Sequence, residues 1–430
     1  MMNSRSGWTQ SAKWFILRLS VTLYNREVSA METSVFFLPD WPPDLSPLLW
    51  IALAVVGAAL AGEWVRHHLG LPRITAYPVV GMLAAAIAGD RLVAAHGDWL
   101  RTGLDVALAI LLFEMGSRVD LRWLRHNRWL LVTSLLESLA AFGAVFFVSR
   151  YLGLATAPAV LLAAIGMATS PAVVMRVVAE CNAQGQVSTR LLVLSALNTI
   201  YAVVAIHLAT GALHQRYSGD WVLAIAHPLY LLGAGLLVGK LLAVAVSSLH
   251  RWLALRDEYA SIVLLGLVLM TIGLIEALRL PVTLCMLFAG IVLRNGERRA
   301  WVFPQHFGSV GGVLVVMLFL VVGMQIKLEH LMTGGGLALL LIGARSLAKL
   351  CGVLLLARPA GVSWRQGLLL GLALAPAAGP VMVAAADLGR IYPDLQLTLV
   401  PVAMSAAAIM ELAGPVIVAL CLKWSGERRE

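Results

Sequence analysis

Among the polar and charged side chains inside the long apolar stretches of this chain, where such groups are rare, eight are candidates for chemistry. Two of them are carboxylates, which can carry a proton or offset the charge of a dehydrated cation. Hydroxyl and amide oxygens can coordinate a cation, but neither group releases a proton near neutral pH. These residue types indicate chemistry of ions and protons. The side chains are Thr169, Ser170, Asn198, Thr199, Glu137, Glu411, Arg345 and Lys349.

The two cations of this set lie one helical turn apart, at Arg345 and Lys349, within a single apolar stretch. A charged side chain at the centre of a bilayer costs roughly 2.5–3.5 kcal/mol, so both cations need anionic partners. One interpretation is a structural salt bridge from Arg345 to Glu137 or Glu411. The other makes Glu411 or Glu137 the group that couples ion movement to a proton. The sequence leaves both interpretations open.

Two proline-containing breaks interrupt apolar stretches in matching halves of the chain. The first follows Ala168-Thr169-Ser170 at Pro171, and the second contains Pro376 and Pro380. About 209 residues separate Pro171 from Pro380. A helix break in lipid frees backbone groups that find no water, so it survives where it lines a buried polar site. Paired breaks in repeated halves point to the binding site of a transporter. Thr169, Ser170 and Asn198 then either satisfy the broken backbone or serve as ion ligands.

The composition indicates a membrane protein, since 60% of the 430 residues are hydrophobic and 13% are charged. A soluble domain carries roughly 25% charged residues. We expect an all-α polytopic membrane protein with about thirteen transmembrane helices. The expected spans are 46–66, 72–89, 101–117, 129–149, 156–180, 190–212, 222–247, 259–277, 280–294, 307–326, 333–357, 365–387 and 396–422.

Thirteen spans can be divided into two repeats of six, 46–212 and 259–422, joined by a linker helix at 222–247. The odd linker inverts the second repeat relative to the first. Both breaks then fall at the fifth helix of a repeat, where they are expected to cross near the midplane. The half-helix ends at such a crossing carry partial charges of about +0.5 and −0.5.

Lysine and arginine are unevenly distributed, with about seventeen in the loops of one side and about seven in those of the other. The positive-inside rule therefore predicts an outside N-terminus and a cytoplasmic C-terminus, with 423–430 as a short cytoplasmic tail. The formal charge of +9 follows from this topology and gives no support to a nucleic-acid partner. No metal-ligand or nucleophile spacing occurs, so we expect no cofactor, no metal and no enzyme activity.

Residues 1–45 form an N-terminal tail that is too short and too interrupted for a span. It is either an interfacial amphipathic segment or not native, in which case translation starts at Met31 instead of Met1.

Several motifs, in order along 46–422, resemble the monovalent cation:proton antiporter superfamily, nearest to its Kef-type, sodium–hydrogen exchanger-like membrane domain. This resemblance implies an elevator-like transporter in a membrane, in which a cation and a proton compete for one carboxylate. It also implies a homodimer. The matching segments are Leu71-Pro72-Arg73-Ile74-Thr75-Ala76-Tyr77, Leu111-Leu112-Phe113-Glu114-Met115-Gly116 followed by Asp120 and Leu121, Ala168-Thr169-Ser170-Pro171, Phe288-Ala289-Gly290-Ile291-Val292-Leu293-Arg294, Leu318-Phe319-Leu320-Val321-Val322-Gly323-Met324 and Glu411-Leu412-Ala413-Gly414-Pro415.

The sequence departs from the superfamily at the sixth span, where the usual Asn-Asp pair is Asn198-Thr199. The aspartate that would bind the cation and titrate is missing. Two hypotheses follow. The chain exchanges potassium or sodium for protons in the bacterial inner membrane through another carboxylate, Glu411 or Glu137. Alternatively, it is a degenerate antiporter that is regulatory or that transports an anion or neutral solute.

Overall fold

The computed structural model describes residues 47–88, 97–218, 221–253, 257–296, 305–326, 328–377, 388, 392, 395 and 397–428. The chain divides into two units, Met1–Trp50 and Ile51–Glu430, and the site lies in the second. The expectations for the tail 1–45, for translation from Met1 or Met31, and for Pro380 fall outside the described residues.

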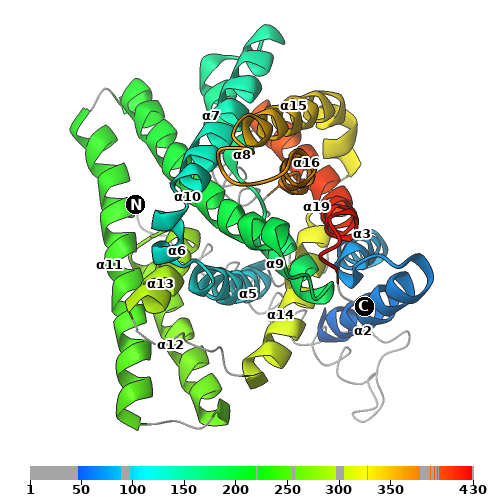
Figure 1. Ribbon diagram of the computed structural model, residues 1–430, viewed down its shortest axis with the longest axis vertical. Helices are drawn as coiled ribbons and strands as arrows, with labels where there is room; N and C mark the ends of the chain where they lie inside the picture. The colour runs from blue at the N-terminus through cyan, green and yellow to red at the C-terminus, as the bar shows by residue number, and fades with distance from the viewer. Residues whose placement is uncertain are drawn as a thin grey trace, which may run out of the picture. The chain divides into compact units, whose positions relative to one another are not determined.

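Helices are the regular secondary structure of the described part of Ile51–Glu430, and each of the expected spans overlaps at least one described helix (Figure 1). Among the described residues, eight helices are long and apolar enough to cross a membrane, and three shorter apolar helices accompany them. The first half contains α2 (Pro47–Leu69), η1 (Arg73–Thr75), α3 (Ala76–Ala88), α5 (Gly97–Ser117), α6 (Leu121–His126), α7 (Arg128–Tyr151), α8 (Thr156–Met167), α9 (Pro171–Glu180) and α10 (Gln186–Ser218).

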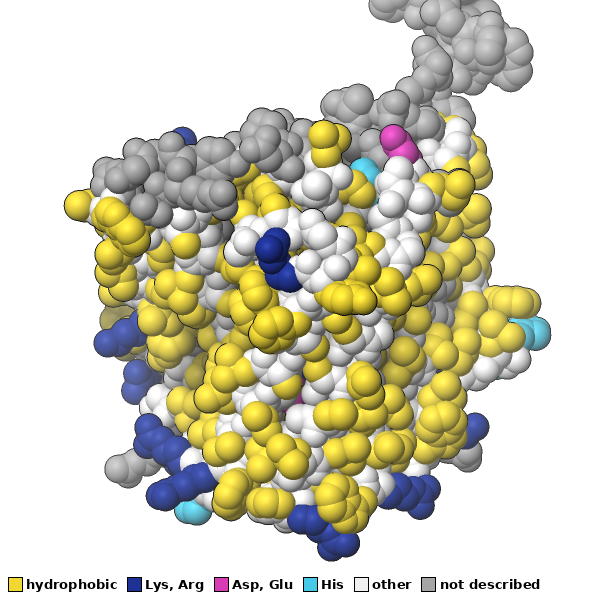
Figure 2. Space-filling view, turned by 90° about the horizontal axis from the view of Figure 1, so that it is seen from above, with side chains coloured by type: hydrophobic (Ala, Val, Ile, Leu, Met, Phe, Trp, Pro, Cys, Tyr) yellow, Lys and Arg dark blue, Asp and Glu magenta, His cyan; other side chains and the backbone are white. Residues whose placement is uncertain are grey.

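The second half follows the long helix α11, which takes the place of the expected linker. Large hydrophobic side chains are exposed along many of these helices, as a lipid-facing surface requires. Figure 2 shows hydrophobic side chains over the middle of one face and many Lys and Arg side chains along its lower edge. The helices are α11 (Trp221–Leu253), α12 (Asp257–Ala277), α13 (Val282–Gly296), α14 (Gln305–Met324), α15 (Leu328–Leu355), α16 (Trp364–Ala373) and α19 (Leu399–Trp424).

The two halves pack in a reciprocal pattern, which is the mark of a repeat. The second helix of the first half, α3, packs against the third helix of the other half, α14, and α5 packs against α13 in the same way. The fourth helices, α7 and α15, pack against each other. Helix α10 contacts α16, while its counterpart α19 contacts α8 and α9. These exchanged contacts agree with two six-helix repeats related by a pseudo-two-fold axis.

Glycines allow the reciprocal helix pairs to approach backbone to backbone. A Cβ atom built on Gly81 of α3 would strike the carbonyl group of Leu320 in α14, and one on Gly323 would strike Pro78 in α3. The same relation joins Gly116 of α5 and Gly290 of α13. Small residues at helix crossings let membrane helices associate through close backbone packing. Glycines at the contact points of both helix pairs therefore allow the close approach of α3 to α14 and of α5 to α13.

The packing separates the helices into two groups. A crossing group contains both broken helices and comprises α7, α8, α9, α10, α15, α16 and α19, whereas a scaffold group comprises α2, η1, α3, α5 and α11 to α14. Figure 1 shows α7, α8, α15 and α16 together and away from α11 and α12. The groups meet where α10 packs on α11 and where α9 packs on α5. Only the crossing group carries the candidate site residues.

Changing Gly323 to Ala should destabilise the protein because its Cβ would overlap the backbone of Pro78. Overpacking of this kind costs about 1–3 kcal/mol. Thermal unfolding in detergent measures the effect. Gly312 lies on the same helix with nothing within 4 Å of its built Cβ, so Gly312→Ala is the matched control. Equal melting temperatures for the two variants would contradict the close α3–α14 packing.

Candidate ion-coupling site

The two helix breaks touch each other. Helix α8 ends at Met167, the chain is extended at Ala168 (φ −63°, ψ 145°), and α9 begins at Pro171 with Ser170 as its N-cap. After α16, the backbone of the second break passes alongside, and the Ser170 N–H donates to the Pro376 carbonyl at 3.0 Å. The Thr169 hydroxyl donates to the Leu374 carbonyl at 3.3 Å. The crossing expected from the sequence is therefore present at Thr169, Ser170 and Pro376.

The guanidinium group of Arg345 lies inside the crossing and bonds to both broken strands of backbone. Its Nε donates to the Gly166 carbonyl at 2.8 Å and its Nη1 to the Ala375 carbonyl at 2.7 Å. Its Nη2 donates to the carbonyl of Ala168 and, at longer range, to those of Leu374 (3.3 Å) and Pro376 (3.4 Å). The side chain is 5% exposed.

This arrangement has a simple electrostatic origin. The C-terminal ends of α8 and α16 each leave carbonyl groups without helical partners and carry a partial negative charge of about −0.5. Arg345 presents five N–H donors and a full positive charge to both ends at once. It therefore satisfies the backbone that the breaks expose and offsets the two helix dipoles.

Lys349, one turn along α15, forms the buried ion pair of the site. Its Nζ lies 2.8 Å from Glu137 Oε2 and 2.9 Å from the Met167 carbonyl oxygen, and both side chains are 0% exposed. Within the described part of the chain, Glu137 Oε1 has no hydrogen-bond partner. Among the described residues, Arg345 pairs with neither Glu137 nor Glu411, so the salt bridge that the sequence suggested for Arg345 is made by Lys349. The guanidinium group of Arg345 is held by carbonyl groups, so the ammonium group of Lys349 is the cation that pairs with Glu137.

Asn198 and Thr199 of α10 bind to the first break. The Asn198 amide donates to Thr169 Oγ1 at 3.2 Å, and the Thr199 hydroxyl lies 3.1 Å from the Thr169 carbonyl and 2.8 Å from the Ser195 carbonyl. Both side chains are at most 1% exposed. The threonine hydroxyl thus donates to backbone at the position where the superfamily pattern places an acceptor carboxylate.

Two serines that the sequence reasoning overlooked complete this network. Ser138 donates to Asn198 Oδ1 at 2.9 Å, and Ser134 approaches the same oxygen at 3.5 Å. Both serines are fully buried on α7, on either side of Glu137 along the chain. The sequence feature that could have identified them is their spacing of one helical turn on the span that carries Glu137. Their hydroxyls link Glu137's helix to the helix of Asn198.

Glu411 is the buried carboxylate that the structure leaves without a described partner. The residue is 2% exposed, and its Oε2 makes no hydrogen bond to any described residue. It lies on the face of α19 that packs on the second break, because Gly414, one turn later, brings its built Cβ within 3.0 Å of Pro376. No hydrogen bond joins Glu411 to Asn198 in the described part of the chain.

Comparison with known protein families identifies a family that matches most of the chain. The family described as "Sodium/hydrogen exchanger, transmembrane" matches residues 51–424. The chain belongs to the sodium/hydrogen exchanger family. Membership supports cation:proton antiport as the general activity and makes the chain an integral membrane protein, in agreement with its apolar helices. A comparison with curated protein sequences finds no match.

Solved structures of an exchanger share the fold. A structure of the sodium proton antiporter MjNhaP1 from Methanocaldococcus jannaschii at pH 8 aligns with a TM-score of 0.67 and 19% identity, covering 88% of this chain and 97% of that one. An electron-microscopy structure of the same antiporter aligns with a TM-score of 0.66 and 17% identity, covering 88% and 96%. At this identity the likeness concerns the fold.

Replacing Lys349 with Met should destabilise the protein by about 3–5 kcal/mol, because it leaves the buried Glu137 carboxylate without its cation. The free energy of unfolding in detergent measures this loss. The double variant Glu137→Gln/Lys349→Met removes both charges and should recover much of the stability. Additive losses from the two substitutions would contradict a coupled pair.

Proposed function

We propose that this sodium/hydrogen exchanger family member exchanges a monovalent cation, sodium or potassium, for protons by elevator-like movement of its crossing group against its scaffold group. The observation that carries the proposal is Glu411, a buried carboxylate beside the second break without a described hydrogen-bond partner. A carboxylate in such a place needs either a bound proton or a bound cation. Alternating occupancy by the two is the elementary step of antiport.

The Glu137–Lys349 pair gives a second place for the same competition. The lysine ammonium sits among oxygen atoms of Glu137 and Met167 at 2.8–2.9 Å, and Glu137 Oε1 remains unused. A cation arriving at Glu137 would compete with the ammonium group, which can then give up its proton. Either carboxylate can therefore couple the two fluxes in the absence of an aspartate at position 199.

Thr169, Ser170, Asn198 and Thr199 are proposed as polar residues of the ion path. They are buried at the first break and offer hydroxyl and carbonyl oxygens. Pro171 and Pro376 keep the breaks in place, while Arg345 and Lys349 supply the fixed positive charge that the negative groups balance.

The setting of the transporter is also a proposal. We place it in the bacterial inner membrane as a homodimer in contact with membrane lipid, with the N-terminus outside and the tail 423–430 in the cytoplasm. The uneven distribution of Lys and Arg supports this orientation. The proposed domain is 46–422, with repeats 46–212 and 259–422 around the linker 222–247.

Changing Glu411 to Gln should abolish cation-driven dissipation of a pH gradient in proteoliposomes, and Glu137→Gln tests the other carboxylate in the same assay. The amide keeps the shape of the side chain and removes its charge and its titration. Glu276→Gln, an exposed change on α12, is the control and should transport normally. Undiminished exchange in both Glu411→Gln and Glu137→Gln would rule out carboxylate coupling at this site.

One observation favours the alternative, a degenerate antiporter without proton-coupled exchange that is regulatory or carries an anion or neutral solute. The Thr199 hydroxyl is bonded to backbone carbonyls and offers no negative charge to an incoming cation. Thr199→Asp restores the charge that the superfamily pattern has there. If the ion path is intact, the Thr199→Asp protein should acquire cation–proton exchange, or should exchange faster than the parent protein. A folded Thr199→Asp protein that transports nothing, from an inactive parent, would support the degenerate alternative.

A further inference from the structure

The far end of half-helix α9 is tied to the scaffold group by a carboxylate. Helix α9 begins at the crossing with Pro171 and ends nine residues later at Glu180, about 14 Å away. Glu180 Oε1 accepts the backbone N–H of Arg73 at 2.9 Å and lies 4.0 Å from Arg73 Nε. Glu180 belongs to the crossing group and Arg73 to the scaffold group, so this contact spans the boundary between them.

Glu180 of the crossing group caps the N-terminus of η1, which belongs to the scaffold group. Arg73 is the first residue of η1, which follows Pro72 and runs directly into α3. The first N–H groups of a helix have no partner inside it and attract negative charge. Glu180 supplies that charge from the other group. The Arg73 side chain itself pairs with Glu63 of α2 at 2.6 Å, within the scaffold group.

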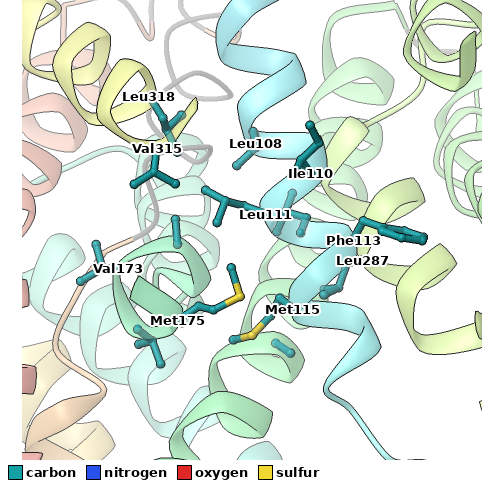
Figure 3. Packing of buried hydrophobic residues seen from close by; sticks show 14 of the residues in the cluster. Leu108, Ile110, Leu111, Phe113, Met115, Val173, Met175, Leu287, Val315 and Leu318 are labelled. Carbon is teal, nitrogen blue, oxygen red and sulfur yellow. The ribbon is translucent and has the colours of Figure 1, made fainter. Parts of the chain in front are cut away.

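A second polar contact crosses the same boundary nearby. Arg176, one turn before Glu180 on α9, donates from Nη2 to the Gly311 carbonyl of α14 at 2.5 Å, and its Nε has no partner among the described residues. Between these contacts and the crossing, the boundary is closed by apolar side chains. Figure 3 shows Val173 and Met175 of α9 gathered with Leu111, Met115, Val315 and Leu318 of α5 and α14, all buried.

We propose that the Glu180–Arg73 contact is a latch that holds α9 against the scaffold group and keeps this side of the crossing closed. The inference rests on the proposed elevator movement, since such a movement must separate α9 from η1 and α14. The latch is built to open. The Glu180 and Arg73 side chains are 18% and 38% exposed, so water can replace the protein partners when the groups part.

The latch predicts that α9 becomes accessible when Glu180 is changed. A charge-assisted hydrogen bond is worth enough to shift a two-state equilibrium roughly tenfold. With Met175→Cys as a reporter, in a variant whose four native cysteines are alanine, a maleimide should react roughly tenfold faster when Glu180→Ala is added. Glu180→Gln keeps an acceptor for the Arg73 N–H and should give an intermediate rate.

Glu63→Gln is the matched control, because it removes a carboxylate from the same arginine without crossing the boundary. It should leave labelling of the reporter slow. Leu318→Cys on α14, buried in the same interface, provides a second reporter should Met175→Cys fail to fold. Equal acceleration by Glu63→Gln and Glu180→Ala, or none by Glu180→Ala, would overturn the latch.

Exchange measured in parallel separates this inference from the proposed function. Unchanged labelling with active cation–proton exchange would reject the latch and leave the transporter in place. Faster labelling in a protein that exchanges nothing would uphold the latch and reject the antiport.

Discussion

Two helices can stop inside an apolar environment only where their last carbonyl groups find donors, and here one guanidinium group supplies donors to both helix breaks. Arg345 bonds to carbonyls before and within the first break and along the second, and so joins the two broken segments that the Ser170–Pro376 hydrogen bond brings side by side. A lysine in its place would offer one nitrogen to carbonyls that diverge from one another, whereas the planar fork reaches several at once. The position of every candidate ligand depends on this arrangement.

The same interaction explains how charge is distributed around the crossing. Because Arg345 is committed to carbonyl oxygens, the buried ion pair falls to Lys349 and Glu137. Glu411 remains with no described partner, on the face of α19 that touches Pro376. Four ionisable side chains are thus buried at one crossing. Burying a charge costs free energy, and a purely structural role would offset little of that cost. Their retention agrees with membership of a family of ion exchangers.

Much of the fold could be predicted from composition and the two proline breaks, because apolar length and backbone hydrogen bonding leave a membrane helix few alternatives. Glu137, Arg345 and Lys349 were named from the sequence, and Lys349 does pair with Glu137, but their role in an ion path stays a prediction. Which cation takes which acceptor could not be predicted. That choice depends on the carbonyls of Leu374 and Ala375, whose orientation is set only when both breaks are folded. Ser134 and Ser138 escaped notice because serine is common in membrane helices.

The central claim is that this crossing still exchanges a cation for a proton although Thr199 replaces the expected aspartate. The most direct test uses the unmodified protein in liposomes with an imposed pH gradient and a trapped pH-sensitive dye, to which sodium, potassium and lithium are added in turn. The account predicts that sodium or potassium collapses the gradient. A gradient that persists with every cation, from mildly acidic to alkaline pH, would contradict it.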